Sequence, residues 1–211
     1  MKENSYQKRM GVFVEKFRRY LQKNSSLPDE IIEAFISAGK PRKYEKGEFF
    51  SKQGEFSDKS AFVCTGIFNV FCVQEEGTLF VVAFLKEDGF VQSRFDFSAP
   101  CNVTIQALCE TFVIEFQTNV LHDMYLQYPQ LGGFIRYVVE KGILVYAAHM
   151  IQIGTKKAED NYLLFQKSFR SDEDRIPQYL IAAYLGITPT QLSRIRKKLS
   201  GAQQARKSKT L

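Results

Sequence analysis

The sequence predicts an α+β fold, in which a jelly-roll-type β-roll lies between an N-terminal pair of helices and a helical C-terminal half. Three observations predict it: short alternating strands between about residues 43 and 117, an apolar stripe of helical period from Leu131 to Ile153, and a glycine turn between two short helices at Gly186. The 211 residues, 45% of them hydrophobic, suffice for a sizeable core. We expect three parts, at residues 1–128, 129–154 and 155–211.

The N-terminal segment has the periodicity of two helices. In the first, apolar residues fall on one side: Val12, Phe13, Phe17, Tyr20 and Leu21. The stretch "NSSLPDE" then interrupts the pattern, with Ser26 as a candidate N-cap and with Asp29 and Glu30 in the first turn of a short second helix.

The middle of the chain has the alternating pattern of apolar and polar residues that is typical of β-strands. Segments such as "SAFVCTGIFNVFCVQEEG", "TLFVVAFLKEDG" and "NVTIQALCETFVIEFQ" are rich in Val, Phe and Ile and are bounded by glycine or charged turn residues. Their number and spacing predict a sandwich or barrel of roughly eight strands.

A long helix is predicted next, because apolar residues recur at three and four positions from Leu131 to Ile153. Over about 24 residues the stripe is about 36 Å long, and Gly132, Gly133 and Gly142 weaken it as an isolated helix. It needs a partner surface, which is either the β-domain or, as we expect, the same helix of a second subunit in a coiled-coil dimer.

The segment "IPQYLIAAYLGITPTQLSRIRKKL" carries the most specific pattern in the chain. Gly186 is suited to end a first helix in the left-handed conformation, and Thr188 and Gln191 form a capping box around Pro189 at the start of a second. This is the spacing of a helix-turn-helix.

The second helix of this pair has two distinct faces. Leu192, Ile195 and Leu199 fall on one side, so the helical period places Thr190, Arg194 and Lys197 on the other, with Ser193 beside them. Such a face suits the DNA major groove, where arginine contacts guanine and small polar residues contact base edges. Gln191, Lys197 and Lys198 are candidate phosphate contacts, and Thr188 lies at the same end.

The charge distribution agrees with a nucleic-acid partner. Residues 156–211 carry 12 Lys and Arg against 5 Asp and Glu, whereas residues 1–155 carry 17 against 18. The basic excess of the chain, +6 overall, therefore lies entirely in its C-terminal part.

Composition disfavours several other classes. The four cysteines, Cys64, Cys72, Cys101 and Cys109, have neither paired metal spacing nor a disulfide framework, and the two histidines form no metal-binding motif. No apolar run approaches a membrane span and no signal peptide is evident, so we expect a cytoplasmic protein that is not an enzyme and has no metal site.

With "KYEKGEFFSKQGEFSDKSAFVCTGIFNVF" leading the roll and "IAAYLGITPTQLSRIRKKL" ending the helical half, the chain resembles the cyclic-AMP receptor and fumarate-nitrate regulator (Crp/Fnr) family of bacterial transcription factors. The resemblance covers roughly residues 25 to 200. It implies a cyclic-nucleotide-binding-like roll, a homodimer joined by the long helix, and a two-fold symmetric DNA site. RNA polymerase and an unidentified small-molecule effector are further partners that it implies.

The chain departs from the family pattern at its C-terminal end. The recognition helix of the family often presents an arginine and a glutamate ahead of a final arginine, but here those first two positions are Pro189 and Thr190, and only Arg194 matches. The operator should therefore differ from the usual one. A β-wing commonly follows that helix, and with only "SGAQQARKSKTL" remaining we expect a truncated wing and a basic tail.

The roll departs from the family at its ligand cassette. In nucleotide-binding members a glutamate holds the ribose and an arginine the cyclic phosphate. Here the arginine position falls on Cys101, followed by Asn102, and the glutamate position falls on Gln92 or Ser93. The resemblance thus implies that cyclic AMP does not bind.

The sequence also bears on ligands other than cyclic AMP. Arg94 could restore anion binding, pair with Asp96 or stay solvated, while aromatic residues would line or fill the pocket: Phe90, Phe95 and Phe97. An iron-sulfur cluster is disfavoured because no cysteine precedes Cys64, and haem has only His122 and Cys72 as unsupported ligands. A protein-interaction module with a degenerate helix-turn-helix is the alternative to a regulator, and a cupin-type enzyme is disfavoured because the roll lacks histidine.

Overall fold

The computed structural model describes residues 2–94 and 98–207, with side chains placed from residue 10 to residue 201 within those ranges. By internal packing the chain divides into two units, residues 1–72 with 83–145 and residues 73–82 with 146–211. The predicted limits at 128 and 154 remain a prediction. Phe95, Asp96 and Phe97, for which the sequence suggested roles, lie outside the described residues.

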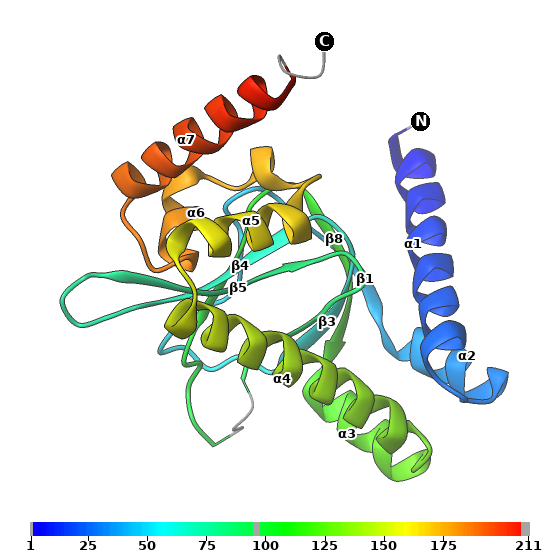
Figure 1. Ribbon diagram of the computed structural model, residues 1–211. Helices are drawn as coiled ribbons and strands as arrows, with labels where there is room; N and C mark the ends of the chain where they lie inside the picture. The colour runs from blue at the N-terminus through cyan, green and yellow to red at the C-terminus, as the bar shows by residue number, and fades with distance from the viewer. Residues whose placement is uncertain (1, 95–97, 208–211) are drawn as a thin grey trace. The chain divides into compact units, whose positions relative to one another are not determined.

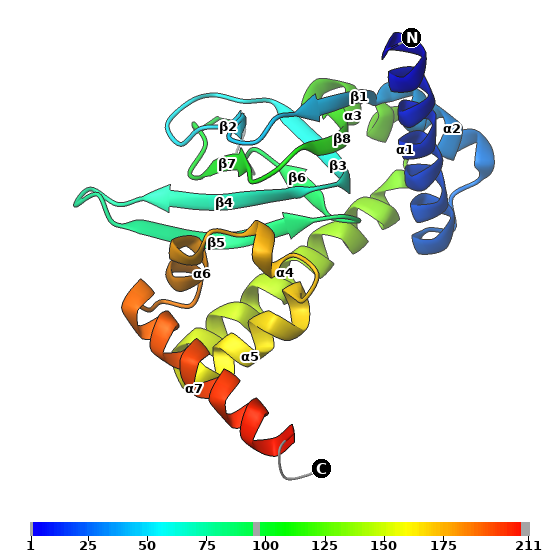
Figure 2. The same ribbon diagram turned by 90° about the horizontal axis from the view of Figure 1, so that it is seen from above.

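Two four-stranded antiparallel sheets form the roll (Figures 1 and 2), with strand orders β1-β8-β3-β6 and β2-β7-β4-β5. The strands are β1 (Lys40–Tyr44), β2 (Phe49–Ser51), β3 (Lys59–Thr65), β4 (Ile67–Val73), β5 (Leu79–Lys86), β6 (Phe90–Gln92), β7 (Thr104–Ala107) and β8 (Thr111–Gln117). The predicted α+β class and roll are confirmed, and the eight strands match the expected number.

Strand β8 lies between β1 and β3 in the first sheet, and both of its faces are buried. It pairs with β1, where Arg42 lies opposite Val113, and with β3, where Phe62 lies opposite Ile114. Between β3 and β4, Gly66 has a φ of +103°, and a Cβ there would stand 2.3 Å from the Thr111 hydroxyl oxygen. Only glycine permits this turn, which closes the roll against the start of β8.

Helices α1 (Lys2–Asn24) and α2 (Asp29–Ala38) pack on the outer side of that sheet, as Figure 2 shows. Their apolar faces join Phe62, Ile114 and Phe116 in one core, to which α4 contributes Leu131 and Phe134. Phe17 and Leu21 are fully buried as the periodicity predicts, but Val12 is 61% exposed. The prediction was wrong for Val12 because the buried stripe of α1 passes through Met10 and Phe17 instead.

The N-cap of α2 also differs from the prediction. The helix begins at Asp29 after Pro28, whose fixed φ of −58° leads into the first turn and whose carbonyl accepts hydrogen bonds from Ile31 and Ile32. Ser26 is therefore not the N-cap. Its neighbour Ser25 instead donates its hydroxyl to the Leu21 carbonyl at 2.7 Å, at the end of α1.

The remaining helices follow the roll in sequence. They are α3 (Thr118–Gln127), α4 (Leu131–Thr155), α5 (Ala158–Phe169), the short 3₁₀ helix η1 (Glu173–Arg175), α6 (Gln178–Tyr184) and α7 (Pro189–Lys207). The long helix thus matches its predicted range. No helix in the described part of the chain has the length and apolar content that a membrane crossing requires.

Helix α7 is longer than the sequence predicts. It continues through residues 200–207, where we expected the start of a truncated wing and a polar tail. The segment "AQQAR" explains the difference, since alanine, glutamine and arginine are all strong helix formers.

Candidate nucleic-acid interface

The turn between α6 and α7 has the geometry that the sequence predicts. Gly186 adopts a φ of +67°, its N–H bonds to the Ala183 carbonyl, and the next N–H, of Ile187, bonds to the Ala182 carbonyl at 3.0 Å. This pair of bonds is a Schellman motif, which satisfies the last carbonyls of α6.

A reciprocal capping box starts α7. The Thr188 N–H donates to Gln191 Oε1 at 2.8 Å, and the Gln191 N–H donates to Thr188 Oγ1 at 3.2 Å. Two backbone donors are satisfied, so the first turn of α7 is fixed by its own side chains. Thr188 and Gln191 therefore have a structural role whether or not they also contact a ligand.

The two faces of α7 separate as predicted. Leu192 is fully buried and Ile195 is 7% exposed, whereas the predicted contact residues are all exposed: Thr188, Thr190, Gln191, Ser193, Arg194, Lys197 and Lys198. Lys198 differs from the others because its ammonium pairs with Glu159 of α5 at 2.7 Å. Its charge is thus partly neutralised within the chain.

A polar cluster behind α7 was not found from the sequence. The Arg196 guanidinium donates to Tyr162 Oη at 2.9 Å and pairs with Glu173 at 2.5 Å, while the Tyr162 hydroxyl donates to the same carboxylate at 2.5 Å. Gln166 donates to both Tyr162 and Glu173. The Arg196 cluster, defined by these four residues, ties α7 to α5 and η1.

The pKa values in the Arg196 cluster follow from this arrangement. Burial alone would raise the pKa of Glu173, but hydrogen bonds from Tyr162, Gln166 and Arg196 hold that pKa below its usual range. Burial, together with the adjacent carboxylate, raises the pKa of Tyr162 to about 12. At neutral pH the cluster therefore contains one cation, one anion and a neutral phenol.

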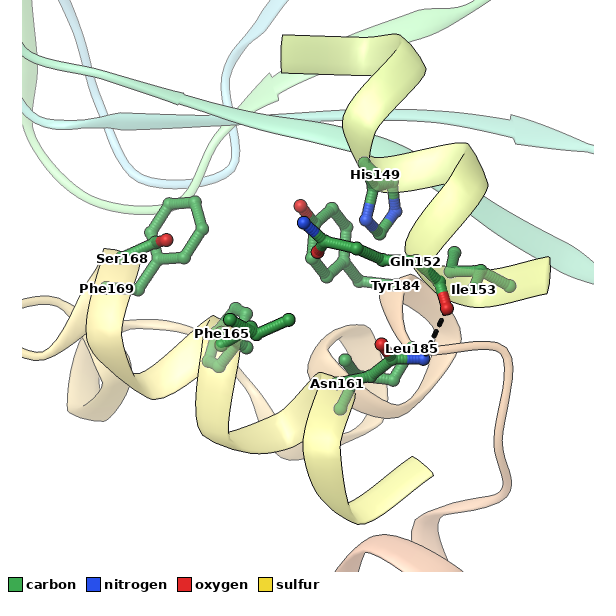
Figure 3. A pocket seen from close by; sticks show the side chains of 10 residues that line it. His149, Gln152, Ile153, Asn161, Phe165, Ser168, Phe169, Tyr184 and Leu185 are labelled. Carbon is green, nitrogen blue, oxygen red and sulfur yellow. Dashed lines mark hydrogen bonds between the residues drawn. The ribbon is translucent and has the colours of Figure 1, made fainter. Parts of the chain in front are cut away.

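A second buried group joins α4, α5 and α6, and it surrounds a pocket of about 40 Å³ (Figure 3). The His149 imidazole stacks on the Tyr184 ring with centroids 3.8 Å apart, and Asn161 donates from Nδ2 to the Gln152 carbonyl at 3.1 Å. His149 is 8% exposed and Asn161 is 6% exposed. Nothing in the spacing of His149, Asn161 and Tyr184 along the chain predicts that they meet.

Burial makes the second unit sensitive to acid. It lowers the pKa of His149 below the ordinary 6.5, although a backbone hydrogen bond with Tyr184 opposes the shift. Below about pH 6.5 His149 binds a proton more readily in the unfolded chain than in the folded unit. The stability contributed by neutral His149 is therefore full above about pH 6.5 and declines as the pH falls toward the folded-state pKa.

In urea titrations followed by circular dichroism, we expect His149→Gln to flatten this decline in stability with falling pH. His122→Gln is the control and should leave the decline in place. An unchanged decline in His149→Gln would contradict the assignment to His149.

In the roll, the predicted effector residues do not form one group. Phe90 packs against Phe17, Tyr20 and Phe134 of the helices, at centroid distances of 5.8–6.3 Å, on the outer side of its sheet. By strand alternation Gln92 shares that side, and it donates from Nε2 to the Arg94 carbonyl. Phe90 is thus part of the helix-facing core rather than of a roll pocket.

Ser93, Arg94 and Cys101 do lie close together, around the segment from residue 54 to residue 59. The Ser93 hydroxyl donates to the Ser57 carbonyl at 2.7 Å, and Cys101 exchanges backbone hydrogen bonds with Gly54 and Glu55. Asn102 is exposed next to the buried Cys101. The structure therefore brings these three predicted residues together, and a buried thiol occupies the position at which the resemblance implies an arginine.

Arg94 is committed within the protein. Its side chain is 6% exposed, forms an ion pair with Asp58, and donates from Nη1 to the Ala99 carbonyl at 2.8 Å. The Phe56 ring lies 5.1 Å from the guanidinium. Among the described residues the partner in this ion pair is Asp58, whereas Asp96, the partner that the sequence suggested, lies outside them.

The inside of the roll is packed with aromatic side chains. Tyr44, Phe50 and Phe68 are at most 1% exposed and contact one another with centroid distances of 5.5–5.8 Å. The Tyr44 hydroxyl donates to Glu115. Within the described residues, no group of three His, Cys, Asp or Glu side chains is placed to hold a metal ion.

Comparison with known proteins places this arrangement in a class. Residues 41–128 match the family model of the cyclic nucleotide-binding domain. The chain is 24% identical over 177 residues to the transcriptional activator protein Anr of Pseudomonas protegens. The matched region covers 79% of this chain and 72% of Anr. The roll is thus similar in sequence to cyclic nucleotide-binding domains.

Solved structures share the fold over most of the chain. FixK2 from Bradyrhizobium japonicum has a TM-score of 0.69 at 18% identity, over 78% of this chain and 86% of its own. CLP of Xanthomonas campestris, a c-di-GMP-responsive global regulator, has a TM-score of 0.68 at 14% identity, over 83% and 93%. The solved structures confirm the fold that the resemblance to the Crp/Fnr regulators implies, and two of the similar proteins, Anr and CLP, are a transcriptional activator and a global regulator.

Proposed function

We propose that the chain is a DNA-binding transcription regulator that acts as a homodimer on a two-fold symmetric site. The observation that carries this proposal is the exposed outer face of α7, which begins at a fixed capping box and presents Thr190, Ser193 and Arg194 together. The basic excess of residues 156–211 and the regulators among its relatives support it. Selection from a random duplex library tests it, because only a dimeric regulator would enrich a two-fold symmetric consensus.

In this function the exposed residues of α7 have different roles. Arg194 would make the bidentate contact to guanine, with Thr190 and Ser193 near the helix start at base edges or thymine methyl groups. Lys197, which is an exposed residue, and the amide of Gln191 would contact phosphates. Because Lys198 already pairs with Glu159, we assign it a smaller share of the phosphate contacts.

Arg194→Ala should weaken binding to the selected sequence by about 1–3 kcal/mol and relax its specificity at one base pair, since an exposed side chain is removed without loss of packing. Lys197→Ala is the matched control, because it should weaken all sequences alike and reduce the salt dependence of binding. Fluorescence anisotropy with selected and scrambled duplexes measures both. If the selected site binds Arg194→Ala as tightly as the parent chain, the groove assignment is wrong.

We assign dimerisation to α4. In the proposed division of the chain, this helix forms the middle part (129–154), between the roll (1–128) and the helix-turn-helix part (155–211). Its apolar side chains that lie 40–70% exposed in the single chain are Ile135, Val139, Ile143, Leu144, Val145, Tyr146 and Ile151. Such a row of exposed apolar residues is typical of a protein interface, which supports this assignment. A second copy of α4 would cover it along a coiled-coil seam and set the spacing of the two α7 helices, which on DNA is about 34 Å.

The effector domain, in our proposal, does not bind cyclic AMP. Cys101 brings no positive charge to the phosphate position, and the guanidinium of Arg94 is paired with Asp58 and nearly inaccessible. Calorimetric titration of the full chain with cyclic AMP should give no saturable heat. Binding at micromolar affinity would overturn this part of the proposal.

A further inference from the structure

We propose that the pocket between α4, α5 and α6 is a binding site for a small uncharged molecule that donates hydrogen bonds. The site lies wholly within the second unit, and it does not depend on the proposed DNA binding. Its volume of about 40 Å³ gives room for about three water molecules or one molecule of about four non-hydrogen atoms.

The polarity of the site follows from two buried acceptors. The backbone hydrogen bond between His149 and Tyr184 engages one ring nitrogen as the donor, and Nε2 is the nitrogen left without a partner among the described residues. In the neutral ring, Nε2 therefore carries a lone pair. Oδ1 of Asn161, also an acceptor, likewise has no partner in the described part of the chain.

Two such acceptors are costly to bury unless a donor satisfies them. Both line the pocket, and Figure 3 shows them on different helices, His149 on α4 and Asn161 on α5, with Phe165 and Tyr184 around them. No charged side chain is among the pocket's lining residues, which disfavours an ionic ligand. The site thus selects for N–H or O–H groups on a small neutral molecule.

The position of the site connects its occupant to the helix-turn-helix. His149 contacts Tyr184, the last residue of α6, and Leu185 of the following turn also lines the pocket. A molecule held by His149 and Asn161 would therefore join α4 and α5 directly at the end of α6. Its occupancy would stabilise this end of the second unit.

Acetamide and acetone are matched probes for the test, because they have the same number of non-hydrogen atoms and only acetamide donates hydrogen bonds. The readout is the ¹⁵N chemical shift of His149 Nε2 in the full chain, and His122→Gln assigns it since the chain has only 2 histidines. We expect a saturable change with acetamide, at the millimolar affinity typical of so small a ligand, and no saturable change with acetone.

Asn161→Leu should remove the acetamide response, because it replaces the second acceptor by an apolar group of similar size. The pair of probes on the unmodified chain keeps the test decisive if this variant does not fold. An equal response to both probes, no saturable response to acetamide, or a spectrum in which Nε2 carries the proton would overturn the proposal. All these readouts are independent of DNA, so failure here leaves the regulator proposal untouched.

Discussion

Ile143→Glu in α4 is expected to convert the proposed dimer into a monomer. The side chain is 60% exposed in the single chain, so the substitution costs little within one subunit, but at a dimer seam it would bury two unpaired carboxylates. We expect the free energy of dimerisation to fall by at least about 3–5 kcal/mol. Sedimentation velocity over a concentration series measures the loss.

Val12→Glu provides a matched control for this change. Val12 is 61% exposed on α1, so the same charge is introduced at an equally exposed apolar position outside α4. It should leave the dimer intact. If Ile143→Glu sediments as the parent does, the apolar face of α4 is not the seam.

Arg196→Ala is expected to lower the free energy of unfolding of the second unit by about 2–4 kcal/mol. It leaves the Glu173 carboxylate, which is 16% exposed, without its cationic partner and removes the Arg196 link from α7 to α5 and η1, so that only the exposed pair of Lys198 and Glu159 still joins α7 to α5 by charge among the described residues. Because α7 is then held less firmly, the proposed binding should weaken for every DNA sequence. Urea unfolding and anisotropy measure the two effects.

The comparison with Arg194, two residues earlier, makes this result specific. Arg194→Ala should change sequence preference with unfolding unaffected, whereas Arg196→Ala should change stability and leave relative preference as it was. Arg196→Lys retains the charge and should restore part of the stability. If Arg196→Ala unfolds at the same urea concentration as the parent chain, the Arg196 cluster contributes nothing measurable to the stability of the second unit.

The features of the candidate interface that were predictable are those encoded locally. The capping box of Thr188 and Gln191 and the left-handed Gly186 depend on residues within one turn of each other, so spacing alone predicted them. The roll was predictable for a similar reason, since alternating apolar residues and glycine turns mark each strand.

The features that were missed depend on contacts between distant segments. Tyr162 meets Arg196 from 34 residues away, and Arg94 meets Asp58 from 36 residues away. Neither pair has a periodic signature, and each partner alone looks like an ordinary surface residue. The same is true of His149 and Asn161, whose burial follows from the packing of three helices rather than from any one of them.

The ion pair of Arg94 and Asp58 affects how well a dissolved anion can compete for Arg94. The guanidinium is almost fully buried, while its carboxylate partner remains 60% exposed. A dissolved anion that approached Arg94 would have to displace a carboxylate that is attached to the same chain and so is present at a high effective concentration. The Asp58 carboxylate thus acts as a built-in counter-ion for the buried Arg94 guanidinium, and neither dilution nor dialysis removes it.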